Sequence, residues 1–133
     1  MKKGNHRHFM QKEIYEQSET TARTIARNVD AESSRIVMPE LEAAAIAQAS
    51  SALLLGCGTA FYAGLVAEYR LERIARLPLE TDLASEFRYR DAVQMPGQLA
   101  IFVSQSGETA DTLAALRHCK ANGLATLGVI NVP

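Results

Sequence analysis

The stretch ALLLGCGTAFYAGLVAEYRLERIAR, residues 52–76, decides the fold class of this chain. Its first four residues, 52–55, form a short continuous apolar run, which is typical of a strand buried on both faces of a sheet. A turn with two glycines follows, and residues 60–76 then have the spacing of an amphipathic helix. A buried strand that leads through a tight turn into a helix predicts the start of a strand–helix–strand unit.

The same alternation continues to the end of the sequence. We predict a weaker strand over residues 78–83, a helical turn over 85–90, a third strand over 99–103, a helix over 108–122 and a last strand over 126–132. Gly123 follows the last helix, where a left-handed residue commonly ends a helix. Short loops between strands and helices predict a parallel sheet with helices on both faces, an α/β fold. Because the sequence stops directly after a strand, we expect a domain truncated at its C-terminal edge.

The N-terminal part of the sequence has a helical pattern instead. Apolar residues recur there at helical spacing, at Phe9, Met10, Ile14, Ala22, Ile25, Ala26 and Val29. Pro39 suits the first turn of a second helix, predicted over residues 40–48. We therefore predict a helical lead-in over residues 1–48 and a sheet-containing domain over residues 49–133.

Composition indicates one ordinary globular domain. The 133 residues are 47% hydrophobic and 22% charged, with a formal net charge of −1. The fourteen Lys and Arg are scattered, which argues against a nucleic-acid partner. No apolar run approaches the roughly 20 residues of a membrane span. Two cysteines without metal-ligand spacing indicate reduced thiols, so we expect a cytoplasmic protein with no membrane partner, metal or cofactor.

The loop Ser104-Gln105-Ser106-Gly107-Glu108-Thr109 is the main candidate for a binding site. It follows a predicted strand, and in open parallel sheets ligands bind beyond the carboxyl ends of the strands. Its three hydroxyls surround the start of a helix, where unpaired N–H donors and a partial positive charge suit an anion such as phosphate. The same spacing also fits an ordinary helix start with Ser106 as the N-cap. Glu108 would repel a dianion unless its carboxylate points away.

A nucleotide site at the first glycine turn is disfavoured. Gly56 and Gly58 match two glycines of the dinucleotide fingerprint, but Phe61 stands where close helix–strand packing needs the third. Asp82 would be the ribose-binding acid of such a site. Neither turn continues into Gly-Lys-Ser/Thr, which excludes a P-loop. Cys57 is expected to be a packed cysteine, because no base is evident beside it.

Two further pairs of residues are assigned structural roles. Arg88 and Arg90 could contact a phosphate, but surface ion pairs are the commoner outcome for such arginines. Tyr62 and Tyr69, on the helix after the first strand, are expected in the core or against a partner.

Four sequence blocks, in this order, resemble the glutamine–fructose-6-phosphate aminotransferases, also called glucosamine-6-phosphate synthases. They are HFMQKEIYEQ (8–17), CGT (57–59), ASEFRYR (84–90) and SQSGETADTL (104–113), and NVP (131–133) is also similar. The resemblance covers nearly the whole chain and corresponds to the first half of the family's sugar-isomerase region. It implies a SIS fold, a flavodoxin-like three-layer α/β/α domain of sugar-phosphate isomerases and their regulators.

The resemblance also implies site residues. In the family, the loop that matches residues 104–109 holds the phosphate of the sugar. By position this role falls to Ser104, Gln105, Ser106 and Thr109, while Gly58, Thr59 and Ala60 lie close to the sugar. At Ala60 many members have a serine that contacts the ligand, so a hydroxyl is absent here although the backbone N–H remains.

No residue of this sequence can be assigned a catalytic role by the resemblance. Family members carry an N-terminal glutaminase domain, and their sugar-isomerising acid–base residues lie in later parts of the chain. The implied function is to anchor fructose 6-phosphate or glucosamine 6-phosphate within a homodimeric enzyme that makes glucosamine 6-phosphate and glutamate from fructose 6-phosphate and glutamine. Two alternatives stay open: a non-catalytic sugar-phosphate sensor, and another SIS enzyme such as a deglycase or deaminase of amino sugar phosphates.

Overall fold

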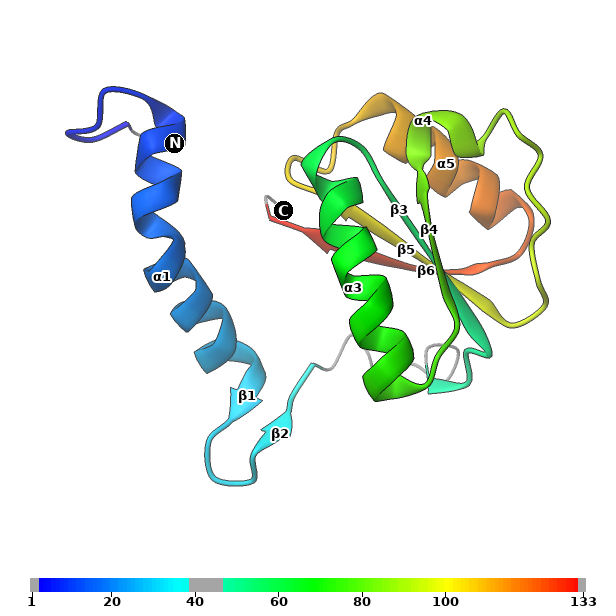
Figure 1. Cartoon of the computed structure of the whole chain (residues 1–133), viewed down its shortest axis with the longest axis horizontal. Coiled ribbons are helices and arrows are strands. Elements are labelled where there is room, and N and C mark those ends of the chain that lie inside the picture. The colour runs from blue at the N-terminus through cyan, green and yellow to red at the C-terminus, as the bar shows by residue number, and fades with distance from the viewer. Residues whose placement is uncertain (1–2, 39–46, 132–133) are drawn as a thin grey trace. The chain divides into compact units, whose positions relative to one another are not determined.

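The computed structural model describes residues 3–38 and 47–131 (Figure 1). The chain divides into two compact units, Met1–Glu42 and Ala43–Pro133. The helix predicted over residues 40–48 lies mostly outside the described residues. The boundary predicted between residues 48 and 49 stays a prediction.

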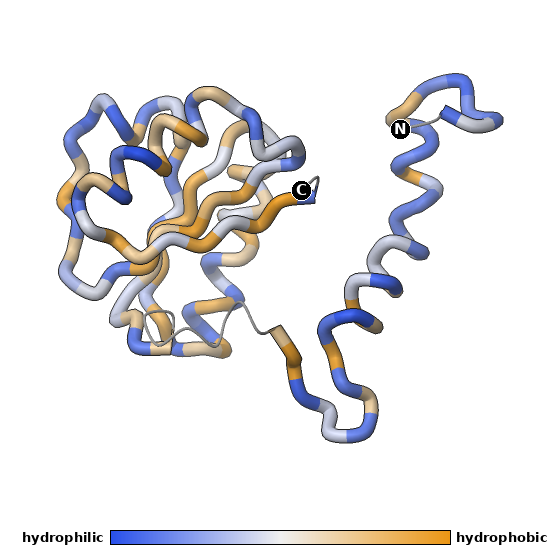
Figure 2. The backbone as a smooth tube through the Cα atoms, turned by 180° about the vertical axis from the view of Figure 1, so that it is seen from behind, coloured by the Kyte–Doolittle hydropathy of each residue, from blue (hydrophilic) through white to orange (hydrophobic). Residues whose placement is uncertain are grey.

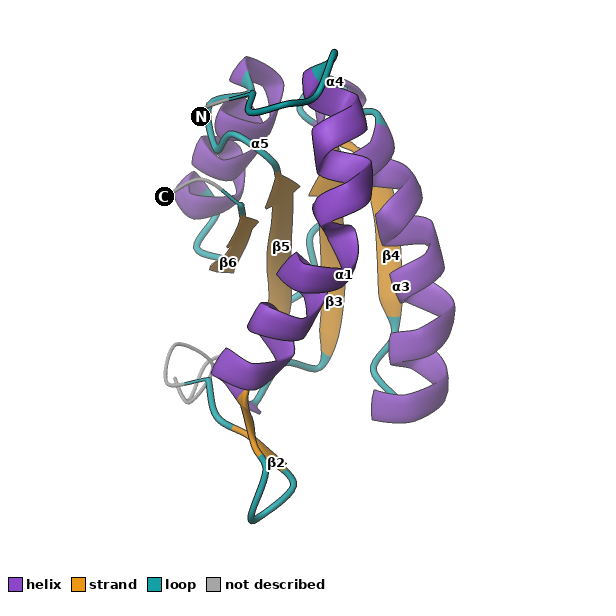
Figure 3. Cartoon of the chain, turned by 90° about the vertical axis from the view of Figure 1, so that its left-hand side faces the viewer, coloured by secondary structure: helices purple, strands orange, loops and turns teal. Residues whose placement is uncertain are grey.

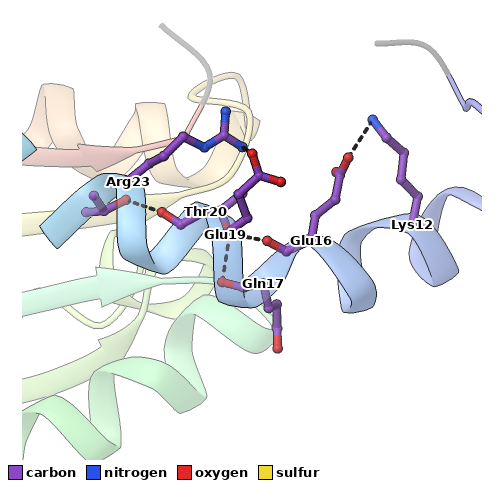
Figure 4. A network of polar contacts seen from close by, with 7 residues as sticks. Lys12, Glu16, Gln17, Glu19, Thr20 and Arg23 are labelled. Carbon is purple, nitrogen blue, oxygen red and sulfur yellow. Dashed lines mark hydrogen bonds and ion pairs between the residues drawn. The ribbon is translucent and has the colours of Figure 1, made fainter. Parts of the chain in front are cut away.

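The first unit consists of the helix α1 (Phe9–Asn28) and a hairpin of two short antiparallel strands, β1 (Val29–Asp30) and β2 (Arg35–Ile36). No residue of α1 is buried within the described chain. Its own polar contacts support it: ion pairs join Lys12 to Glu16 and Arg23 to Glu19, and the Thr20 hydroxyl donates to backbone carbonyls one turn earlier (Figure 4). Each exposed pair of this kind contributes only about 0.2–0.5 kcal/mol.

The prediction of an entirely helical lead-in is wrong at residues 29–36. Val29, which was expected on the helical face, has an extended backbone and begins β1. The reason is the turn that follows, where the Asp30 carboxylate accepts hydrogen bonds from the Glu32 N–H and the Ser33 hydroxyl. These bonds hold the pKa of Asp30 below its ordinary value. Side chains of this type compete with helical hydrogen bonding and favour turns.

The second unit is built on a four-stranded parallel sheet with the order β4-β3-β5-β6 (Figure 3). Its strands are β3 (Ser51–Gly56), β4 (Leu79–Leu83), β5 (Gln98–Ser104) and β6 (Ala125–Ile130). In the centre of the sheet, Leu53 lies in register with Glu80 on one side and with Ala100 on the other. All four strands were predicted, and the last ends two residues earlier than expected.

Helices cover both faces of the sheet, as predicted. The helix α3 (Thr59–Ala75) lies on one face, and α4 (Ala84–Phe87) and α5 (Ala110–Ala121) lie on the other (Figure 1). Gly123 follows α5 with φ +77°, as expected of a left-handed residue that ends a helix. The outer face of α3 carries Tyr62 and Tyr69, which are 65% and 78% exposed, so neither belongs to the core of the described chain.

Alternate residues of β3 supply the two halves of the core, and Figure 2 shows the apolar central strands. Leu53 and Leu55 face α4 and α5, where Phe87 is the largest fully buried side chain. Ala52 and Leu54 face α3. This alternation explains the continuous apolar run in the sequence, because a strand covered on both sides has no polar face.

Gly64 brings α3 close to the sheet. A Cβ atom at this position would lie 2.5 Å from Leu54 Cδ2 and 2.8 Å from Thr81 Cγ2, which no relaxed packing allows. The close approach therefore occurs at Gly64, one turn beyond Phe61. The dinucleotide fingerprint does not reveal this contact, because its fixed spacing places the third glycine at position 61.

The two edges of the sheet differ in charge. At the β4 edge, Glu80 and Asp82 are both paired with Arg90, whose Nε lies 2.9 Å from Asp82 Oδ2. The β6 strand has no charged residue, and its last two residues, Val129 and Ile130, are about half exposed.

Candidate functional site

Two loops meet at the carboxyl edge of the sheet, between the neighbouring strands β3 and β5. The chain leaves β3 through α3 toward β4 on one side, and leaves β5 through α5 toward β6 on the other. The strand order therefore changes direction between β3 and β5, which is the position where open α/β sheets bind ligands. The N-termini of α3 and α5 both lie at this edge, so each directs the positive end of its dipole toward the crevice.

A small open pocket of about 180 Å³ lies in this crevice. It is lined by Cys57, Thr59, Ala60, Val103, Ser104, Gln105, Ser106, Thr109 and Thr112. The fold thus brings together the four residues assigned to the phosphate and two of the three assigned to the sugar. Gly58 does not line the pocket but precedes α3 with φ +57°, where it allows the sharp turn from strand to helix.

Three lining residues were not predicted to contact a ligand: Cys57, Val103 and Thr112. Thr112 lies three residues after Thr109, so the two share a face of α5. This spacing could have identified Thr112 from the sequence. Val103 carries no such signal, because it was indistinguishable from its apolar neighbours in the strand.

The serines of the loop shape its backbone. Ser104, at the end of β5, is 7% exposed, and its Oγ accepts a hydrogen bond from the Gly107 N–H at 3.1 Å. The Ser106 Oγ accepts one from the Glu108 N–H at 3.2 Å. Gly107 has φ +70°, a conformation that glycine adopts without steric cost. Because both hydroxyls act as acceptors within the loop, their protons remain available for a ligand.

The helix begins later than the sequence suggested. Its N-cap is Thr109, so the alternative in which Ser106 caps the helix is wrong. The Ser106 hydroxyl instead bonds two residues ahead, within the turn at Gly107. No side-chain hydrogen bond caps α5 at Thr109, which leaves the N–H donors of the first turn available to an anion.

None of the described charged side chains lines the pocket, and those of two arginines are paired elsewhere. Asp111, in the first turn of α5, pairs with Arg88 at 3.2 Å, and Arg90 pairs with Glu80 and Asp82. The expectation of surface ion pairs for both arginines is confirmed. Asp82 also accepts a hydrogen bond from the Leu83 N–H, so its carboxylate is engaged within the fold.

The two cysteines have different surroundings. Cys57 is half-buried in the pocket wall, and its Sγ accepts a hydrogen bond from the Thr112 hydroxyl, with Oγ1 3.9 Å from Sγ. Cys119, a residue of α5, is fully buried in the core, and burial raises the pKa of its thiol to about 11. Among the described residues, no histidine or carboxylate lines the pocket to act as a base for Cys57.

A larger cavity of about 520 Å³ lies at the opposite edge of the sheet, beside the amino ends of β5 and β6. Its described lining includes Gln94, Gln98 and Asn122 but no ionisable side chain. Nor does any helix N-terminus of the described residues lie at this cavity. The smaller pocket is therefore the better candidate for a charged ligand.

The SIS domain family model matches residues 45–133. This chain belongs to the SIS domain family. It is 55% identical over 131 residues to glutamine–fructose-6-phosphate aminotransferase (isomerizing) of Bradyrhizobium diazoefficiens. The matched region covers 98% of this chain and 22% of that relative. The corresponding protein of Brucella abortus is 52% identical over 130 residues, and the match covers 98% of this chain and 21% of that protein. The chain thus spans about a fifth of the length of these relatives.

A solved structure confirms the SIS fold. The C-terminal domain of glucosamine-fructose-6-phosphate aminotransferase from Francisella tularensis matches with a TM-score of 0.90 and 36% identity, covering 100% of this chain and 37% of that one. Together these matches confirm both the expected three-layer fold and the resemblance, because this SIS chain is homologous to the isomerase region of the aminotransferases.

The described residues lack two further features. In the described part of the chain, no helix combines the length and apolar character needed to cross a membrane. Among the same residues, no group of three or more His, Cys, Asp or Glu side chains is placed to hold a metal ion.

Proposed function

We propose that this chain provides the sugar-phosphate-binding part of the isomerase region of a glutamine–fructose-6-phosphate aminotransferase. Its role is to anchor the phosphate of fructose 6-phosphate or glucosamine 6-phosphate. The supporting observation is the pocket that unites Ser104, Gln105, Ser106 and Thr109 at the start of α5, in a SIS chain homologous to these enzymes.

Each group at the pocket has a role in this proposal. The hydroxyls of Ser104, Ser106 and Thr109, the Gln105 amide and the first-turn N–H groups of α5 donate to the phosphate oxygens. Hydrogen bonds to a charged group contribute about 1.5–3 kcal/mol each. Gly58, Thr59 and Ala60 are assigned to the sugar side, where the Ala60 backbone N–H already donates to the Cys57 carbonyl at 3.2 Å.

The chain positions the substrate and does not transfer protons. No acid–base residue lines the pocket, so the chemistry at the reacting carbons requires groups from the remaining length of such an aminotransferase. Binding energy from a non-reacting phosphate can hold the reacting end in place. Homodimer formation and a cytoplasmic location belong to the same proposal.

Calorimetric titration with fructose 6-phosphate, glucose 6-phosphate and unphosphorylated fructose tests this function. Only the phosphate esters should bind. The double variant Ser106→Ala with Thr109→Ala should lose about 2–4 kcal/mol of binding free energy. Ser50→Ala is the matched control, because it removes a hydroxyl that donates to the Pro96 carbonyl at the other edge of the sheet.

The proposal fails if fructose binds as well as its phosphate ester, or if the double variant keeps wild-type affinity. Circular dichroism must show that each variant is folded. The two alternative functions share this pocket, so a turnover assay on amino sugar phosphates is needed to separate the deglycase and deaminase class from a sensor.

A further inference from the structure

The first turn of α5 carries a carboxylate beside the proposed phosphate site. Asp111 is the second residue of the helix that begins after Thr109. Its Oδ1 lies 3.2 Å from Arg88 Nη2. Arg88 is the C-cap of the short helix α4. The position of α4 therefore places the Arg88 guanidinium next to the first turn of α5.

Asp111 has opposite effects on the helix and on a bound anion. A carboxylate in the first turn interacts favourably with the helix dipole. The same carboxylate competes with a phosphate for the positive potential at that helix end, and Glu108 adds a second negative charge in the loop. Since none of the described lysines and arginines lines the pocket, these charges would oppose a dianion unless a cation outside the pocket offsets them.

Arg88 is held in position to act as that cation. Its guanidinium lies 4.5 Å from the centre of the Tyr89 ring, and Nη2 also contacts the Tyr89 hydroxyl at 2.6 Å. A purely mechanical role is less fitting, because Ala84 and Phe87 already bury α4 against α5 at 0% and 1% exposure. A partly exposed ion pair such as this one adds little to packing of that kind.

We propose that Arg88 is a positioning residue for phosphate binding, which acts by neutralising Asp111 at the start of α5. This inference rests on the proposed function. In water, a single charge about 8 Å from a bound dianion changes the affinity of the protein for that dianion about fivefold. We therefore expect effects of about three- to tenfold, largest at low ionic strength.

The test is a titration of fructose 6-phosphate into wild type, Arg88→Gln, Asp111→Asn and the double variant. Arg88→Gln should weaken binding about three- to tenfold, because Asp111 becomes unpaired. Asp111→Asn should tighten binding by a similar factor, and the double variant should lie within about twofold of wild type. These differences should shrink at about 0.5 M salt.

Two controls accompany these variants. Arg88→Lys keeps the charge and should stay within about twofold of wild type. Arg73→Gln removes the same charge from the last turn of α3, at the opposite end of that helix from the pocket, and should leave affinity unchanged.

The direction in which Asp111→Asn changes the affinity for fructose 6-phosphate separates this inference from a purely structural role of the ion pair. If the pair only holds α4 against α5, both single variants weaken binding and salt has no selective effect. That result, or an unchanged affinity in Arg88→Gln, overturns the inference while leaving the proposed function intact. If wild type binds no sugar phosphate, the proposed function fails and the inference fails with it.

Discussion

The replacement Ser104→Ala tests whether the candidate loop is shaped by its own hydroxyls. Ser104 is buried, and its Oγ is the acceptor for the Gly107 N–H at 3.1 Å. A hydrogen bond of this kind contributes about 0.5–1.5 kcal/mol, and leaving a buried donor unpaired costs more. Gly107 is only half-buried, so water can reach its N–H in the variant, and we expect a loss of about 1 kcal/mol.

Urea unfolding followed by circular dichroism measures this loss. With a slope of about 2 kcal/mol per molar urea, the midpoint should fall by about 0.5 M. Ser106→Ala is the matched comparison, because Ser106 is exposed and its loss should change stability by less than about 0.5 kcal/mol. Both variants should bind fructose 6-phosphate at least about tenfold more weakly. Equal stability of wild type and Ser104→Ala would refute a structural role for this hydroxyl.

The remaining predictions concern packing and the thiols. Gly64→Ala should destabilise the fold by about 1–2 kcal/mol in urea unfolding, because the overlap with Leu54 and Thr81 outweighs the gain in helix propensity, and an unchanged midpoint would contradict the close approach. At about pH 8, iodoacetamide should alkylate Cys57 well before Cys119, whose pKa is raised to about 11 by burial, as peptide mass spectrometry can show. Stability should fall as pH rises from the ordinary thiol pKa of 9.0 toward about 11, because the unfolded chain then loses a proton that the folded chain keeps.

The sheet could be predicted because strands buried on both faces appear in the sequence as continuous apolar runs. Strands such as β3 and β5 consist almost entirely of apolar residues, and Gly123 ends α5 where its conformation requires a glycine. The hairpin after α1 was missed because the helical spacing extends to Val29 while the hydrogen bonds of Asp30 already form a turn. Local side-chain bonds of this kind do not alter hydrophobic periodicity.

The sequence predicted most of the residues that line the candidate pocket, but not where α5 begins or how the loop turns. The position of the loop after a strand, together with the family resemblance, identified Ser104 and Thr109. The helix start was misplaced because the left-handed Gly107 adds a turn before Thr109, which hydroxyl spacing alone does not reveal. The Arg88–Asp111 pair joins residues 23 positions apart, so only the packing of α4 on α5 brings it to the site.

The unequal edges of the sheet have a practical consequence for solution work. The charged side chains on β4 discourage another strand from pairing there, whereas β6 carries no charge and leaves Val129 and Ile130 exposed in the described part of the chain. Self-association of the chain should therefore begin at β6. Protein concentration then becomes a variable in any titration, and affinities measured at a single concentration can contain a contribution from dimerisation.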